Sequence, residues 1–146
     1  MNIGALTGFP MQDVKATLIG GSYHETDSSE VAFEAAAVIA FENAVRGAEP
    51  VLLEPIMKMQ VIVPTEHTGR VIGDLNARHA RIHQTGAQGT SEIIEADVPL
   101  AETFQYTTDL RSMTQGRGSF TMEFSYHDLV PANLRSAILN QQLTFE

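Results

Sequence analysis

Hydrophobic residues recur along this chain with two different periods, which together predict an alternation of strands and helices. Apolar residues near every second position predict strands at 12–19, 56–63, 80–84, 91–98 and 117–126. Apolar residues three or four positions apart predict helices at 28–46, 65–78 and 101–114, and a last helix after Pro131. Six prolines lie at or near the ends of these segments, where they favour the end of one element and the start of a turn or loop.

The longest predicted helix, at 28–46, carries signals at both ends. Asp27 is placed to cap its N-terminus, with Glu30 in the position of a capping box. Gly47 suits a C-terminal glycine cap, and Pro50 prevents the helix from continuing. The segment is rich in alanine and apolar on several sides, so we expect it to cover another part of a domain.

The order of predicted elements between residues 56 and 128 is β-α-β-β-α-β. This is the order of the ferredoxin-like unit, an α+β fold with a four-stranded antiparallel sheet and two helices on one face. The first fifty residues supply one strand and one helix, which is too little for an independent domain. We therefore expect these residues to be the end of a larger domain.

Composition narrows the classes of function. The chain has 146 residues, of which 43% are hydrophobic, and its formal net charge is −9. A chain this acidic does not attract nucleic acid through its overall field, so an RNA contact would need local geometry. The chain has no cysteine, which excludes disulfides and thiolate metal sites. The longest apolar run has seven residues, and no signal peptide is recognisable. We expect a cytoplasmic protein without membrane contact.

Candidate catalytic groups are few. A phosphate-binding loop needs a lysine between glycine and serine or threonine, and neither Lys15 nor Lys58 has those neighbours. His79 and His83 are four residues apart, but they fall across a predicted helix end and strand start, so no metal site is predicted. Serine, histidine and aspartate types occur together around residue 28, but within a single loop, which is unlike a catalytic triad. We predict no catalytic site.

Two sets of residues are candidates for contact with RNA. One is the loop between the first predicted strand and helix, which offers flexible glycines, a hydroxyl, an aromatic ring and an imidazole. Its members are Gly20, Gly21, Ser22, Tyr23 and His24. The other set consists of arginines around the two helices of the ferredoxin-like unit, namely Arg70, Arg78, Arg81, Arg111 and Arg117. An ordinary glycine turn and a solvated face are the alternatives for these two sets.

Four stretches resemble the C-terminal portion of translation elongation factor G. They are GSYHETDSSEVAF at 21–33, PVLLEPIMK at 50–58, GRVIGDLNAR at 69–78 and ADVPLAETFQYTTDLRSMTQGRGSFTMEF at 96–124. By this resemblance, residues 1–50 are the end of domain IV, a partial segment like the second domain of ribosomal protein S5. Residues 51–130 are the ferredoxin-like domain V, and residues 131–146 are the C-terminal helix that returns towards domain IV.

The resemblance implies a function on the ribosome. In this family an N-terminal GTPase domain, with GTP and magnesium, drives movement of tRNA and mRNA, and the present segment needs no cofactor. Gly20, Gly21, Ser22, Tyr23 and His24 match the domain IV tip that enters the decoding site. Arg70, Arg78, Arg81 and Arg117 are implied contacts to large-subunit ribosomal RNA. The family's arginine-rich helix end is altered here, where residues 77–81 read ARHAR.

Other interpretations stay open. The chain could come from a ribosomal protection or recycling paralogue, which shares this architecture. It could also be a free-standing ferredoxin-like module that binds a ligand or self-associates through its sheet. If domain IV is truncated, the helix at 28–46 lacks part of its cover, and we expect either oligomerisation through its apolar face or a rearranged first segment.

Overall fold

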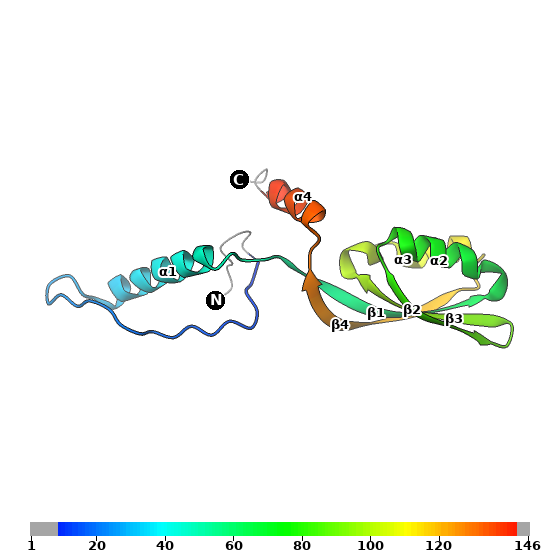
Figure 1. Ribbon diagram of the computed structural model, residues 1–146, viewed down its shortest axis with the longest axis horizontal. Helices are drawn as coiled ribbons and strands as arrows, with labels where there is room; N and C mark the ends of the chain where they lie inside the picture. Colours follow the sequence, from blue (N-terminus) through cyan, green and yellow to red (C-terminus); the bar gives the residue numbers. More distant parts are fainter. Residues whose placement is uncertain (1–8, 143–146) are drawn as a thin grey trace. The chain divides into compact units, whose positions relative to one another are not determined.

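A computed structural model describes residues 9–142 of the chain, and the side chains as far as residue 138. These residues fall into two compact units. The first contains residues 9–52 and 131–142, and the second is Leu53–Val130. Figure 1 labels the α-helices and strands of both units.

The second unit is built around a four-stranded sheet. Its elements, in chain order, are β1 (Leu53–Pro64), η1 (Thr65–His67), α2 (Thr68–Ala77), β2 (Arg81–Gln88), β3 (Ser91–Pro99), η2 (Leu100–Thr103), α3 (Tyr106–Met113) and β4 (Ser119–Leu129). The strand order is β2-β3-β1-β4, and every neighbouring pair is antiparallel. Both helices lie on the same side of the sheet (Figure 1). The predicted α+β, ferredoxin-like fold is confirmed.

The core of this unit lies between the sheet and the two helices. Alternate residues of the central strands point into it, because side chains of a strand project to opposite faces. Residues of α2 and α3 at helical spacing complete it. The buried members are Met59, Val61, Val63, Val71, Leu75, Ile94, Ala96, Val98, Tyr106 and Leu110. The predicted buried face of α2 is therefore confirmed, with Ile72 packing against the core at its margin.

Two predictions in this unit are wrong in detail. The continuous helix expected at 101–114 is divided, because Gln105 has the left-handed φ of 62° and separates η2 from α3. This break leaves Phe104 75% exposed, while Tyr106 occupies the core. The strand expected at 80–84 runs on to Gln88, so the hairpin turn uses Gly89, whose φ of 63° favours glycine.

In the first unit, α1 (Glu30–Gly47) begins slightly later than predicted. Its N-cap is Ser29 rather than Asp27, since Ser29 has extended backbone and its side chain accepts a hydrogen bond from Ala32 N at 3.2 Å. Gly47 is the last helical residue, and Ala48 takes the C-cap position. The helix expected after Pro131 is present as α4 (Ala132–Gln142).

The strand predicted at 12–19 is absent, since no residue between 9 and 23 is in a strand. Leu18 and Ile19 are 90% and 98% exposed. Alternating hydrophobicity cannot make a strand unless a neighbouring strand takes up its backbone hydrogen bonds, and the described part of this unit contains none. Exposed apolar side chains also line α1, at Val31, Phe33, Val38 and Ile39. Self-association through this face stays a prediction.

Two acidic side chains face each other across neighbouring strands at the beginning of β1. Glu54 lies directly opposite Asp128 of β4, and burial, followed by the negative charge of Asp128, raises the pKa of Glu54. The folded state then binds this proton more tightly than the unfolded state. Stability is therefore lost as the pH rises above the ordinary value of 4.5.

Replacing Glu54 with glutamine is expected to raise the free energy of unfolding at pH 7 by up to about 0.5 kcal/mol. At a pH where both carboxyl groups are protonated, the variant should match the wild type. Urea denaturation at the two pH values measures the difference. Glu92→Gln is the control, because Glu92 lies opposite Val63 and Ala87 rather than a carboxylate. A Glu54 variant less stable than the wild type at pH 7 would contradict this interpretation.

Candidate functional site

The loop singled out in the sequence, Gly20 to His24, is exposed throughout and precedes α1. The Tyr23 ring stacks on that of Phe33, with centroids 6.4 Å apart and planes at 9°. This contact joins the loop to the first turns of α1. Gly20 and Gly21 have open space where a Cβ would lie, so neither glycine is required by close packing.

His24 is held by a short turn that sequence reasoning missed. His24 N donates to Ser28 Oγ at 2.8 Å, and Ser28 N donates to the His24 carbonyl at 3.1 Å. The next residue, Ser29, caps α1. Two adjacent serines therefore connect His24 to the start of a helix, one by closing the turn and the other by capping. The only signal for this turn in the sequence is a pair of serines before a helical pattern.

The four arginines implied as contacts to large-subunit RNA do not form one patch. Arg117 contacts η1, which leads into α2, and Arg70 lies in the first turn of α2. Arg78 and Arg81 follow the other end of the helix. Ten helical residues span about 15 Å, so the four residues make up two separate sites.

Arg78 is engaged inside the domain. Its Nε donates to Asp74 at 2.8 Å, its Nη1 to the Glu102 carbonyl at 2.7 Å, and its Nη2 to Asp109 at 2.5 Å. The guanidinium also lies 5.0 Å from the centre of the Tyr106 ring. Burial lowers the pKa of Arg78, but the bonds to the two aspartates raise it by more, so it stays charged. Arg78 joins α2 to η2 and α3, and an RNA phosphate would have to displace these partners.

Arg81 is exposed at the start of β2, opposite Asp97 on β3. His83 Nε2 lies 2.9 Å from Asp97 Oδ2, and the Tyr126 hydroxyl donates to the same oxygen at 3.3 Å. Burial and the charge of Asp97 raise the pKa of Tyr126. Asp97 is therefore the shared partner of His83 on β2 and Tyr126 on β4.

The two histidines near the end of α2 have separate partners, because His79 lies 3.6 Å from Glu102 while His83 contacts Asp97. No group of three or more histidine, cysteine, aspartate or glutamate side chains that could hold a metal occurs among the described residues. Within the same part of the chain, no helix is long and apolar enough to cross a membrane.

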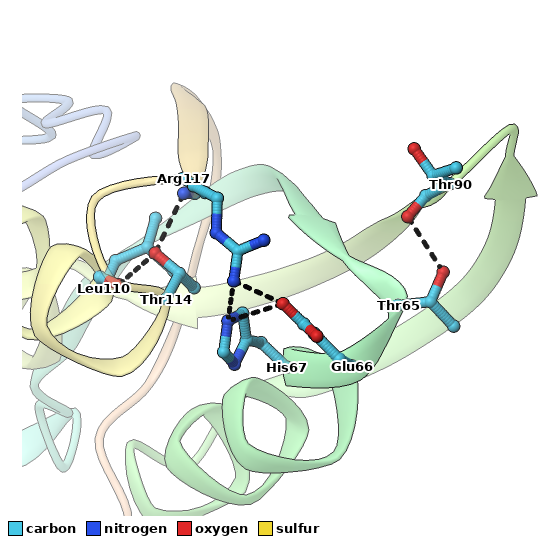
Figure 2. Close-up of polar contacts among 8 residues, drawn as sticks. Thr65, Glu66, His67, Thr90, Leu110, Thr114 and Arg117 are labelled. Carbon is cyan, nitrogen blue, oxygen red and sulfur yellow. Dashed lines mark hydrogen bonds and ion pairs between the residues drawn. The ribbon is translucent and has the colours of Figure 1, made fainter.

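Arg117 lies at the opposite end of the domain, in the loop between α3 and β4 (Figure 2). Its Nη2 donates to Glu66 Oε1 and lies 3.0 Å from His67 Nε2. The Arg117 side chain is 51% exposed. Sequence reasoning found Arg117 but missed Glu66 and His67, because they are about fifty residues away in the chain.

Backbone contacts fix both sides of this cluster, as Figure 2 shows. Thr65 donates to the Thr90 carbonyl through its amide at 3.2 Å and its hydroxyl at 3.1 Å, which anchors η1 to the β2–β3 turn. Thr114, fully buried, donates to the Leu110 carbonyl at 2.7 Å and accepts from Gly118 N at 2.8 Å. The backbone that carries Glu66 and His67 and the backbone that carries Arg117 are therefore each held by bonds other than the contact between these side chains.

Comparison with known proteins identifies this architecture. Residues 1–49 match the family model for elongation factor G, domain IV, and residues 51–138 match the model for the elongation factor G C-terminus. The chain is also similar to a protein from Thermus thermophilus of known crystal structure. The two are 41% identical with a TM-score of 0.87, over 99% of this chain and 22% of that chain.

The ferredoxin-like unit and the matched segments define part of a translation elongation factor. The chain belongs to the elongation factor G family. It spans about a fifth of the length of the Thermus protein that it matches.

Proposed function

We propose that this chain is the ribosome-contacting part of a translational GTPase, and that it promotes translocation of tRNA and mRNA. Family membership and the exposed loop that presents His24 support this function. In this proposal GTP and magnesium bind to another part of the protein, and the present segment contributes no catalytic group.

The observation that carries the proposal is the anchoring of an exposed loop to a helix. The Ser28 turn, the Ser29 cap and the stacked Tyr23 and Phe33 rings restrict the loop without burying it. Such a loop can act by shape, entering the space that tRNA leaves in the decoding site and opposing its return. A steric action of this kind tolerates a net charge of −9, whereas binding through the overall field would not.

The proposed second contact is between the ferredoxin-like unit and large-subunit ribosomal RNA. Arg70, Arg81 and Arg117 are exposed on this unit, and arginine forks match phosphate geometry. Because Arg117 and Arg81 lie at different ends of α2, we expect two local phosphate contacts rather than one continuous basic surface.

The test uses the full-length factor. Replacing His24 with alanine is expected to slow translocation about tenfold, equal to ~1.4 kcal/mol in the activation barrier, because the loop loses its contact with the moving RNA. GTP hydrolysis should stay at the wild-type rate. Rapid-mixing measurements of mRNA movement and phosphate release separate the two steps. Thr26→Ala, an exposed change in the same turn, is the control. An unchanged translocation rate would contradict the proposal and favour a protection or recycling role.

A further inference from the structure

The guanidinium of Arg117 is occupied at one nitrogen. Nη2 carries two N–H donors, and it contacts both Glu66 Oε1 and His67 Nε2. A neutral imidazole accepts at Nε2 when its proton is on Nδ1, and in that tautomer of His67 both donors of Nη2 have an acceptor. Among the residues whose side chains the structure describes, Nε and Nη1 of Arg117 have no hydrogen-bond partner.

The occupied nitrogen is the one that a phosphate needs. A guanidinium binds two oxygen atoms along one of two planar edges, either Nε with Nη2 or Nη1 with Nη2. Both edges include Nη2. A phosphate can therefore take only a single contact from Arg117 until Glu66 or His67 moves away from that nitrogen.

Exchange of these partners is physically accessible. The Glu66 and Arg117 side chains are 59% and 51% exposed, and ion pairs at such positions are weak. The backbone of η1 is anchored through Thr65, and that of the Arg117 loop through Thr114. Rotation of the two side chains would consequently leave the fold unchanged while freeing the fork of Arg117.

We propose that Glu66, assisted by His67, is an internal competitor for the RNA phosphate that Arg117 binds. Arg117 then binds a phosphodiester with two bonds only when it exchanges one of these acceptors, first of all the charged Glu66 carboxylate, for the phosphate, which disfavours isolated phosphates and weak encounters. The inference rests on the proposed contact between the ferredoxin-like unit and ribosomal RNA, and it assigns a specificity-determining role to Glu66.

The experiment measures binding of the 146-residue chain and its variants to purified bacterial large ribosomal subunits at one salt concentration. Glu66→Gln is expected to tighten binding about three- to tenfold, because it weakens the internal pair and removes a carboxylate beside the phosphate. Arg117→Ala is expected to weaken binding, and the double variant to bind like Arg117→Ala alone. Glu123→Gln, on β4 opposite Lys58, is the control with the same change in net charge.

The outcomes separate the inference from the function on which it rests. Equal binding of the wild type and Arg117→Ala, or no binding by either, would refute the RNA contact itself. Weaker binding by Arg117→Ala, with Glu66→Gln no tighter than the wild type, would overturn the competitor role alone. Equal tightening by Glu66→Gln and Glu123→Gln would also overturn it, by showing a general charge effect. Thermal unfolding of each variant establishes that the compared chains are folded.

Discussion

Replacing Arg78 with methionine is expected to lower the free energy of unfolding of the Leu53–Val130 unit by about 2 kcal/mol. The variant leaves the Asp74 and Asp109 carboxylates without their cation and the Glu102 carbonyl without its donor. Breaking a fully buried pair costs about 3–5 kcal/mol. The loss expected here is smaller than that range, because the Asp109 side chain is 44% exposed and water replaces part of the lost interaction.

Arg78→Lys is the informative companion, since it keeps the charge and most of the apolar stem but loses the planar fork. A lysine can reach one of the three acceptors well, so we expect about half of the methionine effect. Urea denaturation followed by circular dichroism measures both variants. If the free energy of unfolding of Arg78→Met were within about 0.5 kcal/mol of the wild-type value, the hydrogen bonds of Arg78 would not contribute measurably to stability, and the prediction would be wrong.

Gly118→Ala is expected to destabilise the same unit by about 2 kcal/mol, for a steric reason. A Cβ at this position would lie 2.8 Å from Thr114 Oγ1 and 3.1 Å from Leu110 Cγ. Neither neighbour can move easily, because both are buried and Thr114 Oγ1 is hydrogen-bonded to the Leu110 carbonyl and to Gly118 N. The methyl group would therefore distort the start of β4 or break the Thr114 bonds.

Gly73→Ala provides the matched control within α2. A Cβ at Gly73 meets nothing within 4 Å, and alanine favours a helix interior over glycine. This change should stabilise the unit by about 0.5–1 kcal/mol. Chemical denaturation of the two variants compares the same substitution in open and closed space. A Gly118 variant as stable as the wild type would mean that the Thr114 contact relaxes without cost.

The ferredoxin-like unit was predictable because its local patterns agree with its tertiary environment. Alternate residues of β1 and β3 are buried, and α2 has its apolar positions at helical spacing. The split at Gln105 was not predictable in this way, since a positive φ at glutamine leaves no periodic signal. The strand expected at 12–19 failed for a different reason, because a strand depends on a partner that its own sequence does not contain.

The candidate site residues, like the fold, were predictable from the sequence only in part. The pattern of glycines, Tyr23 and His24 indicated an unusual loop, and the grouped arginines indicated candidate sites for phosphate, which stay a prediction. Their different environments came from contacts between distant segments. Arg78 is hydrogen-bonded to Asp74, four residues earlier, and this spacing could suggest the contact. It is also hydrogen-bonded to Glu102 and Asp109, which spacing along the chain could not suggest.

The sequence by itself determined the order of strands and helices, the α+β class and the resemblance to elongation factor G, because these depend on local periodicity and residue runs. The tertiary structure alone decided that Arg78 is an internal connection and that Arg117 faces Glu66 and His67. The two arginines have the same side-chain chemistry. Which acceptors surround each one is settled only when the sheet and helices bring segments tens of residues apart into contact.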